Sequence, residues 1–168
     1  MVLIVNTTSD HSITEELKTQ LKGKGIDAEF VETDSMQISH CIGCNYCWLK
    51  TPGVCSIKDD YEIILKKVIH ADQLWVISET ALGFLDHKGK NIFDRILPIA
   101  TMNLRFVGNQ MRHIPRYEKR TDIGIIYSGE PDRDYLERWS KRAALNFESS
   151  SLGVFEKNKL KEAVSCMC

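Results

Sequence analysis

Four of the six cysteines of the chain lie in one short stretch, CIGCNYCWLKTPGVC. Cys41, Cys44, Cys47 and Cys55 follow the pattern C-x2-C-x2-C-x7-C. Thiolates three residues apart on an irregular loop can face one side of an iron–sulfur cubane, and the turn predicted by TPG would return the last cysteine as a fourth ligand. Zinc sites usually combine two C-x2-C pairs, so zinc fits this spacing less well. Two interpretations remain: a [4Fe–4S] site, or a loop that holds no metal.

The compartment of the protein bears on these thiols. The opening MVLIVNTTSD has no basic segment, and its apolar run is too short for a signal peptide. We therefore expect a cytoplasmic protein, in which clustered cysteines indicate metal or redox chemistry more often than disulfides. Cys166 and Cys168 are too close in sequence for an unstrained disulfide with each other, and we expect free surface thiols there.

Composition excludes two classes of partner. The 168 residues are 43% hydrophobic and 27% charged, which fits one globular domain over residues 1–168. Lys and Arg number 22 against 23 Asp and Glu, so no net positive field attracts nucleic acid. No apolar stretch is long enough to cross a membrane. We expect neither nucleic acid nor a membrane as a partner.

The apolar pattern predicts strands that alternate with helices. The expected strands are Val2–Asn6, Asp27–Glu32, Leu74–Ser78, Asp122–Ser128 and Ser151–Glu156. The expected helices are Ile13–Lys22, Asp60–His70 with Asp59 as N-cap, Lys88–Ile99 and Asp132–Phe147. This alternation is typical of βαβ units, so we predict an α/β, three-layer doubly wound domain with a five-stranded parallel sheet.

Two segments interrupt the alternation. The cysteine-rich loop, residues 41–58, has no periodicity of its own. Residues 103–114 alternate on both sides of Gly108–Asn109, which predicts a hairpin with a type II′-like turn.

In open α/β sheets ligands bind at the carboxyl ends of the strands, where the strand order reverses. The first loop there, TTSDHS, leads into a helix and carries the hydroxyls of Thr7, Ser9 and Ser12. Hydroxyls and backbone N–H groups at a helix start can bind a phosphate. Alternatively, Ser9 or Ser12 only caps the helix.

A second loop at this edge, ETALGFLDHKGK from Glu79 to Lys90, follows the predicted strand Leu74–Ser78. Thr80, Gly83 and Phe84 suit close backbone approach to a ligand and flat contact with an aromatic ring. The alternative is an ordinary strand-to-helix connection.

The chain resembles the flavodoxin-like NAD(P)H-dependent FMN reductases, in particular the branch related to iron–sulfur flavoproteins. The resemblance rests on CIGCNYCWLKTPGVCSIKDD (Cys41–Asp60), ALGF (Ala81–Phe84), KNIFDRILP (Lys90–Pro98), and RYEKR ahead of IGIIY. It implies a flavodoxin-like fold with FMN at the strand ends. It also implies a homodimer or homotetramer whose subunits help to enclose the flavin.

The resemblance also implies roles for single residues. It assigns the FMN phosphate to Thr7, Ser9 and Ser12, and the isoalloxazine to Thr80, Ala81, Leu82, Gly83 and Phe84. It assigns a [4Fe–4S] cluster to Cys41, Cys44, Cys47 and Cys55. Lys90, Asp94 and Arg95 match a K-x-x-x-D-R element, for which a solvated helix face with an ion pair is an alternative explanation.

The implied function is transfer of a hydride from NAD(P)H to FMN and then of electrons to a small-molecule acceptor. No protein side chain is expected to be catalytic, because the cofactor performs the chemistry. One alternative is an iron–sulfur flavoprotein that carries electrons to a redox partner protein. Another is a flavodoxin-fold module without flavin, which is indicated by Asp10 where flavodoxins have a glycine.

Overall fold

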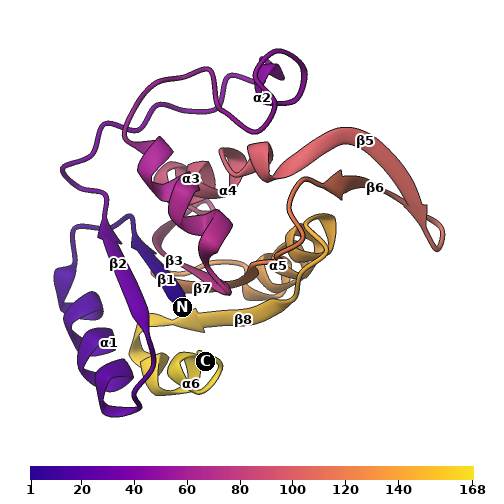
Figure 1. Cartoon of the computed structure of the whole chain (residues 1–168). Helices are drawn as coiled ribbons and strands as arrows, with labels where there is room; N and C mark the ends of the chain where they lie inside the picture. Colours follow the sequence, from indigo (N-terminus) through magenta and orange to yellow (C-terminus); the bar gives the residue numbers. More distant parts are fainter.

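The computed structural model describes residues 1–168 and has a parallel sheet between two layers of helices (Figure 1). The strand order is β2-β1-β3-β7-β8, and each neighbouring pair is parallel. This order is that of the flavodoxin-like doubly wound fold, so the predicted fold class is confirmed. The strands are β1 (Val2–Asn6), β2 (Ala28–Glu32), β3 (Gln73–Ala81), β7 (Asp122–Ser128) and β8 (Ser151–Glu156).

Helices cover both faces of the sheet. One face carries α1 (His11–Gly23) and α6 (Leu160–Ser165). The other face carries α3 (Tyr61–His70), α4 (His87–Asp94) and α5 (Arg133–Asn146). None of these helices combines the length and the apolar character that crossing a bilayer requires.

Strand β1, between β2 and β3, shows why its sequence is a continuous apolar run. Leu3 and Val5 pack into the apolar cluster under α3 and α5, whereas Val2 and Ile4 pack into the cluster under α1 and α6. All four side chains are fully buried. A strand covered on both faces cannot alternate between apolar and polar residues, and the sequence reflects this.

Two segments leave this core. The segment between β2 and α3 carries the cysteines and a short helix, α2 (Tyr46–Leu49). The other is a two-stranded arm, β5 (Ala100–Val107) and β6 (Gln110–Pro115), which extends away from the sheet (Figure 1). Val107 pairs with Gln110 across a tight turn in which Gly108 has φ +61°. The predicted hairpin is confirmed, and its strands are longer than the sequence pattern indicated.

Three local features differ from the sequence expectation. β3 continues past Ser78 and folds back as β4 (Phe84–Leu85) through a two-residue turn at Leu82 and Gly83, whose φ values are +51° and +78°. The expected helix up to Ile99 ends at Asp94, and a 3-10 turn follows, because Pro98 cannot continue the α-helical hydrogen bonds. Helices α2 and α6 were not predicted.

Candidate functional site

The loops after β1, β3 and β7 meet at the carboxyl edge of the sheet. The backbone N and the hydroxyl of Thr7 both donate to the carbonyl of Ile77, at 2.9 and 2.8 Å. The hydroxyl of Thr80 donates to the carbonyl of Ser128 at 3.2 Å. The hydroxyls of Thr7 and Thr80 thus help to hold these loops at the same edge of the sheet.

The predicted phosphate segment is ordered by its own side chains. Thr7 is buried and its hydroxyl is used by Ile77. The hydroxyl and backbone N of Ser12 both donate to the carboxylate of Asp10. Ser9 is exposed, and the backbone N–H groups of Ser9 and His11 have no hydrogen-bond partner within the protein. The assignment of a phosphate to this loop stays a prediction, and Ser9 and the two free amides are the groups available to it.

Asp10 is the N-cap of α1 and occupies the place where a phosphate would approach the helix. Its carboxylate accepts from Ser12 and from Nζ of Lys157, the latter at 3.3 Å. These two hydrogen bonds, from Ser12 first and then Lys157, hold the pKa of Asp10 below its usual value. The ionised carboxylate competes with a phosphate for the first-turn amides and repels it.

Further carboxylates surround this helix start. His11 lies between Glu32 and Asp34, with ring nitrogens at 3.3 and 3.1 Å from their oxygens. Three carboxylates thus surround the helix start, those of Asp10, Glu32 and Asp34. The basic side chains that contact them are His11 and Lys157. The donor set fits an anion through Ser9 and the free amides, but the acidic neighbours weaken that fit.

A cavity of about 190 Å³ lies beside this loop, where the strand order reverses between β1 and β3. It is bordered by Thr7, by Asp34 and His40 from the segment after β2, and by His87 and Lys88 at the start of α4. The rings of His40 and His87 face each other with centroids 5.7 Å apart. This is the position at which doubly wound proteins bind ligands.

The predicted ring-binding segment, residues 80–84, forms the tip of the β3–β4 hairpin. Leu82 at the tip is fully exposed, at 106% of its reference area. Phe84 instead packs against Tyr135 and Trp139 of α5, with ring centroids 5.6 and 5.1 Å away. Exposed apolar surface at this tip comes from Leu82 and the neighbouring Ala81, while the ring of Phe84 supports the hairpin.

The four thiols of the cysteine segment border one shared space but are not packed around a single point. Cys41, Cys44, Cys47 and Cys55 line one cavity of about 30 Å³, and all are free thiols. No three Cys, His, Asp or Glu side chains come close enough to hold a single metal ion. Four thiols around one shared space match the donor set of an iron–sulfur cluster. The cavity has the volume of about one water, so a cubane requires the exposed end of the segment to move outward.

The protonation of these thiols depends on their neighbours. A hydrogen bond with the Ser56 hydroxyl, 3.3 Å from its sulfur, lowers the pKa of Cys44. Burial, followed by the proximity of the other three thiols, raises the pKa of Cys47. Mutual repulsion among thiolates is relieved when positive iron binds between them.

Arg95 lies beneath the cysteine segment and is 2% exposed. Its Nη1 contacts Oδ2 of Asp59 at 2.5 Å and donates to the carbonyl of Ser39 at 2.9 Å. Its Nη2 donates to the sulfur of Cys55 at 3.4 Å, and its guanidinium lies over the ring of Tyr61 at 4.6 Å. Its Nε is buried without a partner. Arg95 therefore fixes the returning end of the cysteine segment to the body of the protein.

Two sequence expectations about this region need correction. The first is the explanation of Lys90, Asp94 and Arg95 as a solvated helix face with an ion pair. It is correct for Lys90 and Asp94, which pair with each other and are 35% and 45% exposed, but it is wrong for Arg95, which is buried. Asp59 is not the N-cap of α3, because Asp60 occupies that position, although the Asp60 side chain makes no capping hydrogen bond. Asp59 accepts from the backbone of Tyr61 at 3.2 Å while it pairs with Arg95.

Trp48 connects the cysteine segment to the arm. Its Nε1 donates to the carbonyl of Leu97 at 2.9 Å. Its ring packs on His113 of β6 with centroids 4.6 Å apart. Sequence reasoning missed this contact and the Asp10–Lys157 pair, because both join residues far apart in the chain.

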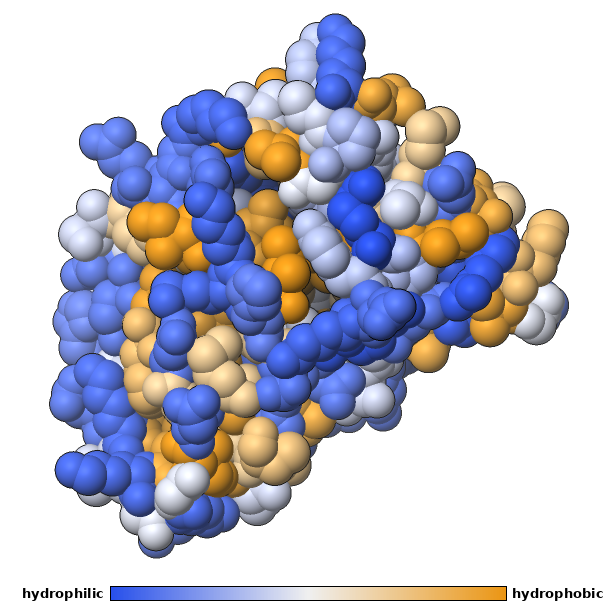
Figure 2. Space-filling model, in the orientation of Figure 1, coloured by the Kyte–Doolittle hydropathy of each residue, from blue (hydrophilic) through white to orange (hydrophobic).

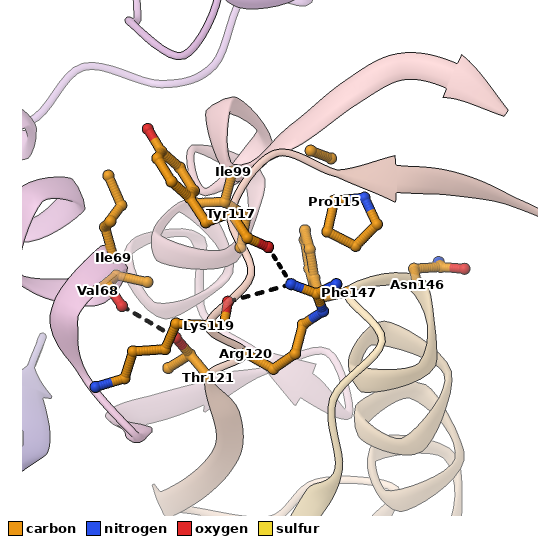
Figure 3. Close-up of a pocket in the computed structure, with 11 residues that line it drawn as sticks. Val68, Ile69, Ile99, Pro115, Tyr117, Lys119, Arg120, Thr121, Asn146 and Phe147 are labelled. Atoms are coloured by element: carbon orange, nitrogen blue, oxygen red, sulfur yellow. Dashed lines mark hydrogen bonds between the residues drawn. The ribbon is translucent and has the colours of Figure 1, made fainter.

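A small cavity at the opposite, amino edge of the sheet is structural (Figure 3). Arg120 donates to the carbonyl of Tyr117 and turns the chain toward β7, and the hydroxyl of Thr121 donates to the carbonyl of Val68 at 3.0 Å. The volume of this cavity, about 20 Å³, is enough for at most one water molecule.

No protein-family model matches the chain. It is 32% identical over 101 residues to an iron–sulfur flavoprotein of Methanocaldococcus jannaschii, covering 60% of this chain and 48% of that protein. It is 34% identical over 83 residues to an iron–sulfur flavoprotein of Archaeoglobus fulgidus, covering 49% and 40%. The chain spans about half the length of the curated relatives it matches.

Solved structures are similar in fold. RosB with a bound 8-demethyl-8-formylriboflavin-5'-phosphate intermediate superposes with a TM-score of 0.61 at 16% identity, covering 92% of this chain and 63% of RosB. Megasphaera elsdenii flavodoxin superposes with a TM-score of 0.51 at 15% identity, covering 98% of each chain. The predicted resemblance is confirmed: the chain is similar to iron–sulfur flavoproteins in sequence and to flavodoxin-like proteins in fold.

Proposed function

We propose that this protein is an FMN-binding oxidoreductase that takes hydride from NAD(P)H and passes electrons to a small acceptor. The observation that carries the proposal is the meeting of the loops after β1, β3 and β7 at the ligand edge of a flavodoxin-like sheet. The names of the sequence relatives, which are iron–sulfur flavoproteins, support a flavin.

FMN, when bound, would supply the hydride and electron chemistry. The protein's residues would bind and orient it. Ser9 and the free amides at the start of α1 would receive the phosphate, and the hairpin tip at Leu82 would contact the ring. Lys157 neutralises Asp10 and thereby reduces the repulsion that the phosphate meets.

A second candidate is an electron carrier that uses a [4Fe–4S] cluster at Cys41, Cys44, Cys47 and Cys55. The shared cavity of these four thiols favours it. The donor set fits the cluster, and the Arg95 N–H aimed at the sulfur of Cys55 would stabilise the negative charge of a bound thiolate. In this case the electrons would pass to a redox partner protein.

Anaerobic purification followed by three measurements tests both candidates. FMN binding is followed by flavin fluorescence, iron and acid-labile sulfide are assayed per chain, and NAD(P)H consumption is measured with a quinone acceptor. Steady-state turnover with bound FMN supports the oxidoreductase. Bound cluster with almost no turnover supports the carrier, and absence of both cofactors contradicts both proposals.

A paired cysteine substitution tests the cluster residues directly. Cys55→Ser removes the sulfur that Arg95 contacts and should abolish stoichiometric iron. Cys166 lies in the C-terminal segment next to Ser165, outside the four-thiol cavity, so the Cys166→Ser variant should retain stoichiometric iron. Equal iron in the two variants would exclude the assigned ligand set.

We also propose that the chain forms a homodimer through the arm. Met102, Phe106 and Met111 are 52%, 75% and 57% exposed. Figure 2 shows hydrophobic side chains on the arm, which projects at the right of the view. Exposed apolar surface of this kind is typical of an interface. Light scattering of wild type and Phe106→Glu tests the proposal, and a wild-type monomer at micromolar concentration would refute it.

A further inference from the structure

A large cavity lies outside the carboxyl edge described above. It has a volume of about 490 Å³ and lies between the arm, α4, α5 and the helix α2 of the cysteine segment. Pockets that bind small molecules have volumes of roughly 300–1,000 Å³. This cavity is therefore large enough for an organic ligand of several rings.

Aromatic side chains form much of its wall. Trp48, Phe93, Trp139 and Phe147 all line it. Trp48 is fixed by its hydrogen bond to Leu97 and by its packing on His113, and Trp139 is fixed by edge-on contact with Phe93 at 5.1 Å. Rigid aromatic walls favour a flat ring system, which can stack on one wall or meet another edge-on.

The same cavity is positively charged. Arg112 and Arg142 line it, and neither forms an ion pair with a carboxylate. Both guanidinium groups donate to the side-chain oxygen of Gln110 at 2.9 Å. Arg112 also retains a buried Nε without any partner. Nη1 of Arg112 also donates to the carbonyl of Leu145 at 3.5 Å. Two adjacent guanidinium groups whose acceptors are all neutral leave donors and charge for an anion.

The other charged side chains of the lining do not cancel the positive charge of Arg112 and Arg142. Asp94 is the carboxylate that lines the cavity, and it is paired with Lys90, which also lines it. His113 directs Nδ1 to the carbonyl of Thr101 at 2.7 Å, so in the neutral ring Nδ1 carries the proton. The lining thus has two unpaired positive charges and no unpaired negative charge.

We propose that this cavity binds a planar aromatic molecule with an anionic substituent, such as an aryl sulfonate or aryl carboxylate. The rings would lie between Trp48 and Trp139, and the anionic group would bind Arg112 and Arg142. The ligand would then lie against Trp48, which is adjacent to Cys47 in the sequence. The proposal concerns equilibrium binding and does not depend on FMN or a cluster.

Two of the three tryptophans of the chain line the cavity, so tryptophan fluorescence reports directly on its occupancy. The full-length protein without FMN is titrated with anthraquinone-2-sulfonate and, separately, with neutral 2-(hydroxymethyl)anthraquinone. We expect saturable quenching by both, with the sulfonate binding about tenfold more tightly or better. Equal affinities, or no saturable quenching by the sulfonate up to millimolar concentration, would overturn the proposal. This comparison uses the wild-type chain alone.

Charge-matched variants locate the anion. The double variant Arg112→Gln, Arg142→Gln should lower sulfonate affinity about tenfold and leave the neutral compound unchanged. The control Arg133→Gln, Arg138→Gln also removes two arginines, both exposed on α5 and outside the cavity lining, so affinity should stay at the wild-type value. Circular dichroism confirms that each variant is folded. If the control loses as much affinity as the double variant, attraction by net charge explains the binding and the assigned site is wrong.

Discussion

Breaking the buried Asp59–Arg95 pair should be among the most destabilising single changes in this protein. The side chains of Arg95 and Asp59 are 1% and 8% exposed, and their closest contact is 2.5 Å. Asp59→Asn keeps the shape of the side chain but removes its charge. The guanidinium then stays buried without a counter-charge, over the ring of Tyr61 and beside Cys55.

The magnitude follows from the burial. Removing one partner of a buried ion pair costs about 3–5 kcal/mol, because the remaining charge is neither paired nor hydrated. Asp59 also accepts from the backbone of Ser39 at 2.8 Å, and an asparagine oxygen can keep that bond. We therefore expect a loss of about 3 kcal/mol for Asp59→Asn, a large fraction of the stability of a typical domain, about 5–15 kcal/mol.

Urea unfolding of the cofactor-free protein, followed by circular dichroism, measures this loss. Asp94→Asn is the matched control, because it breaks the Lys90–Asp94 pair, whose side chains are 35% and 45% exposed. An exposed pair contributes at most about 1 kcal/mol. The double change Asp59→Leu, Arg95→Met should recover part of the loss, since it removes both charges. Equal free energies of unfolding for Asp59→Asn and Asp94→Asn would refute the reasoning.

The same pair predicts a pH dependence. Burial raises the pKa of Asp59, but the hydrogen bonds from Arg95 and Ser39 outweigh it, so the folded-state pKa lies below its usual value. The contribution of the pair is then fully present above the unfolded pKa of about 3.9 and is lost as the pH falls through the lower, folded value. The difference in unfolding free energy between wild type and Asp59→Asn should therefore be constant near neutral pH and shrink below about pH 4.

Two further predictions concern packing and ligand affinity. Gly124→Ala should cost about 1–3 kcal/mol in thermal or urea unfolding, because the new Cβ would lie 2.5 Å from the buried ring of Trp75. Gly23→Ala, with nothing within 4 Å, should leave stability unchanged or raise it, and the opposite ranking would contradict the packing shown here. Asp10→Ser should increase FMN affinity about tenfold, since a unit charge about 5 Å from a dianion costs about 1.6 kcal/mol in water. Fluorescence titration measures this increase, and Lys157→Met should instead reduce affinity. An Asp10→Ser variant that binds FMN no better than wild type would contradict the repulsion.

Strands β1, β7 and β8 could be predicted from the sequence with the same bounds that the structure shows. The apolar runs of β1 and β7 are nearly continuous because helices cover both faces of the sheet, and turn residues mark their ends. The edge strand β8 has a weaker pattern, with only Val154 buried. The shorter elements α2 and β4 could not be predicted this way. The four residues of α2 and the two residues of β4 are too few to show a period of 3.6 or of 2. Only the tight turn that allows β4 had a visible signal, in Gly83.

In the candidate site, too, features that are local in sequence could be predicted, whereas contacts between distant residues could not. The spacing of the cysteines is local in sequence, and the structure places the four of them on one cavity. The hydroxyls of the first loop are also local in sequence, but Thr7 and Ser12 turn theirs to Ile77 and Asp10. The groups that set their charge are remote: Lys157 is 147 residues from Asp10, and Arg95 is 40 residues from Cys55. Sequence patterns carry no information on such pairs until the fold brings them together.

Asp10 shows what this distinction means for function. From the sequence, a carboxylate in a phosphate loop argues against a nucleotide, and that argument treats its charge as uncompensated. In the structure Lys157 at the end of β8 and the first turn of α1 compensate much of the charge. The affinity for FMN is then determined by the Asp10–Lys157 pair and not by Asp10 alone. Lys157→Met should therefore weaken FMN binding more in the wild-type background than in Asp10→Ser, because only the former leaves an unopposed carboxylate. Equal effects in the two backgrounds would show that Lys157 acts on the phosphate directly and not through Asp10.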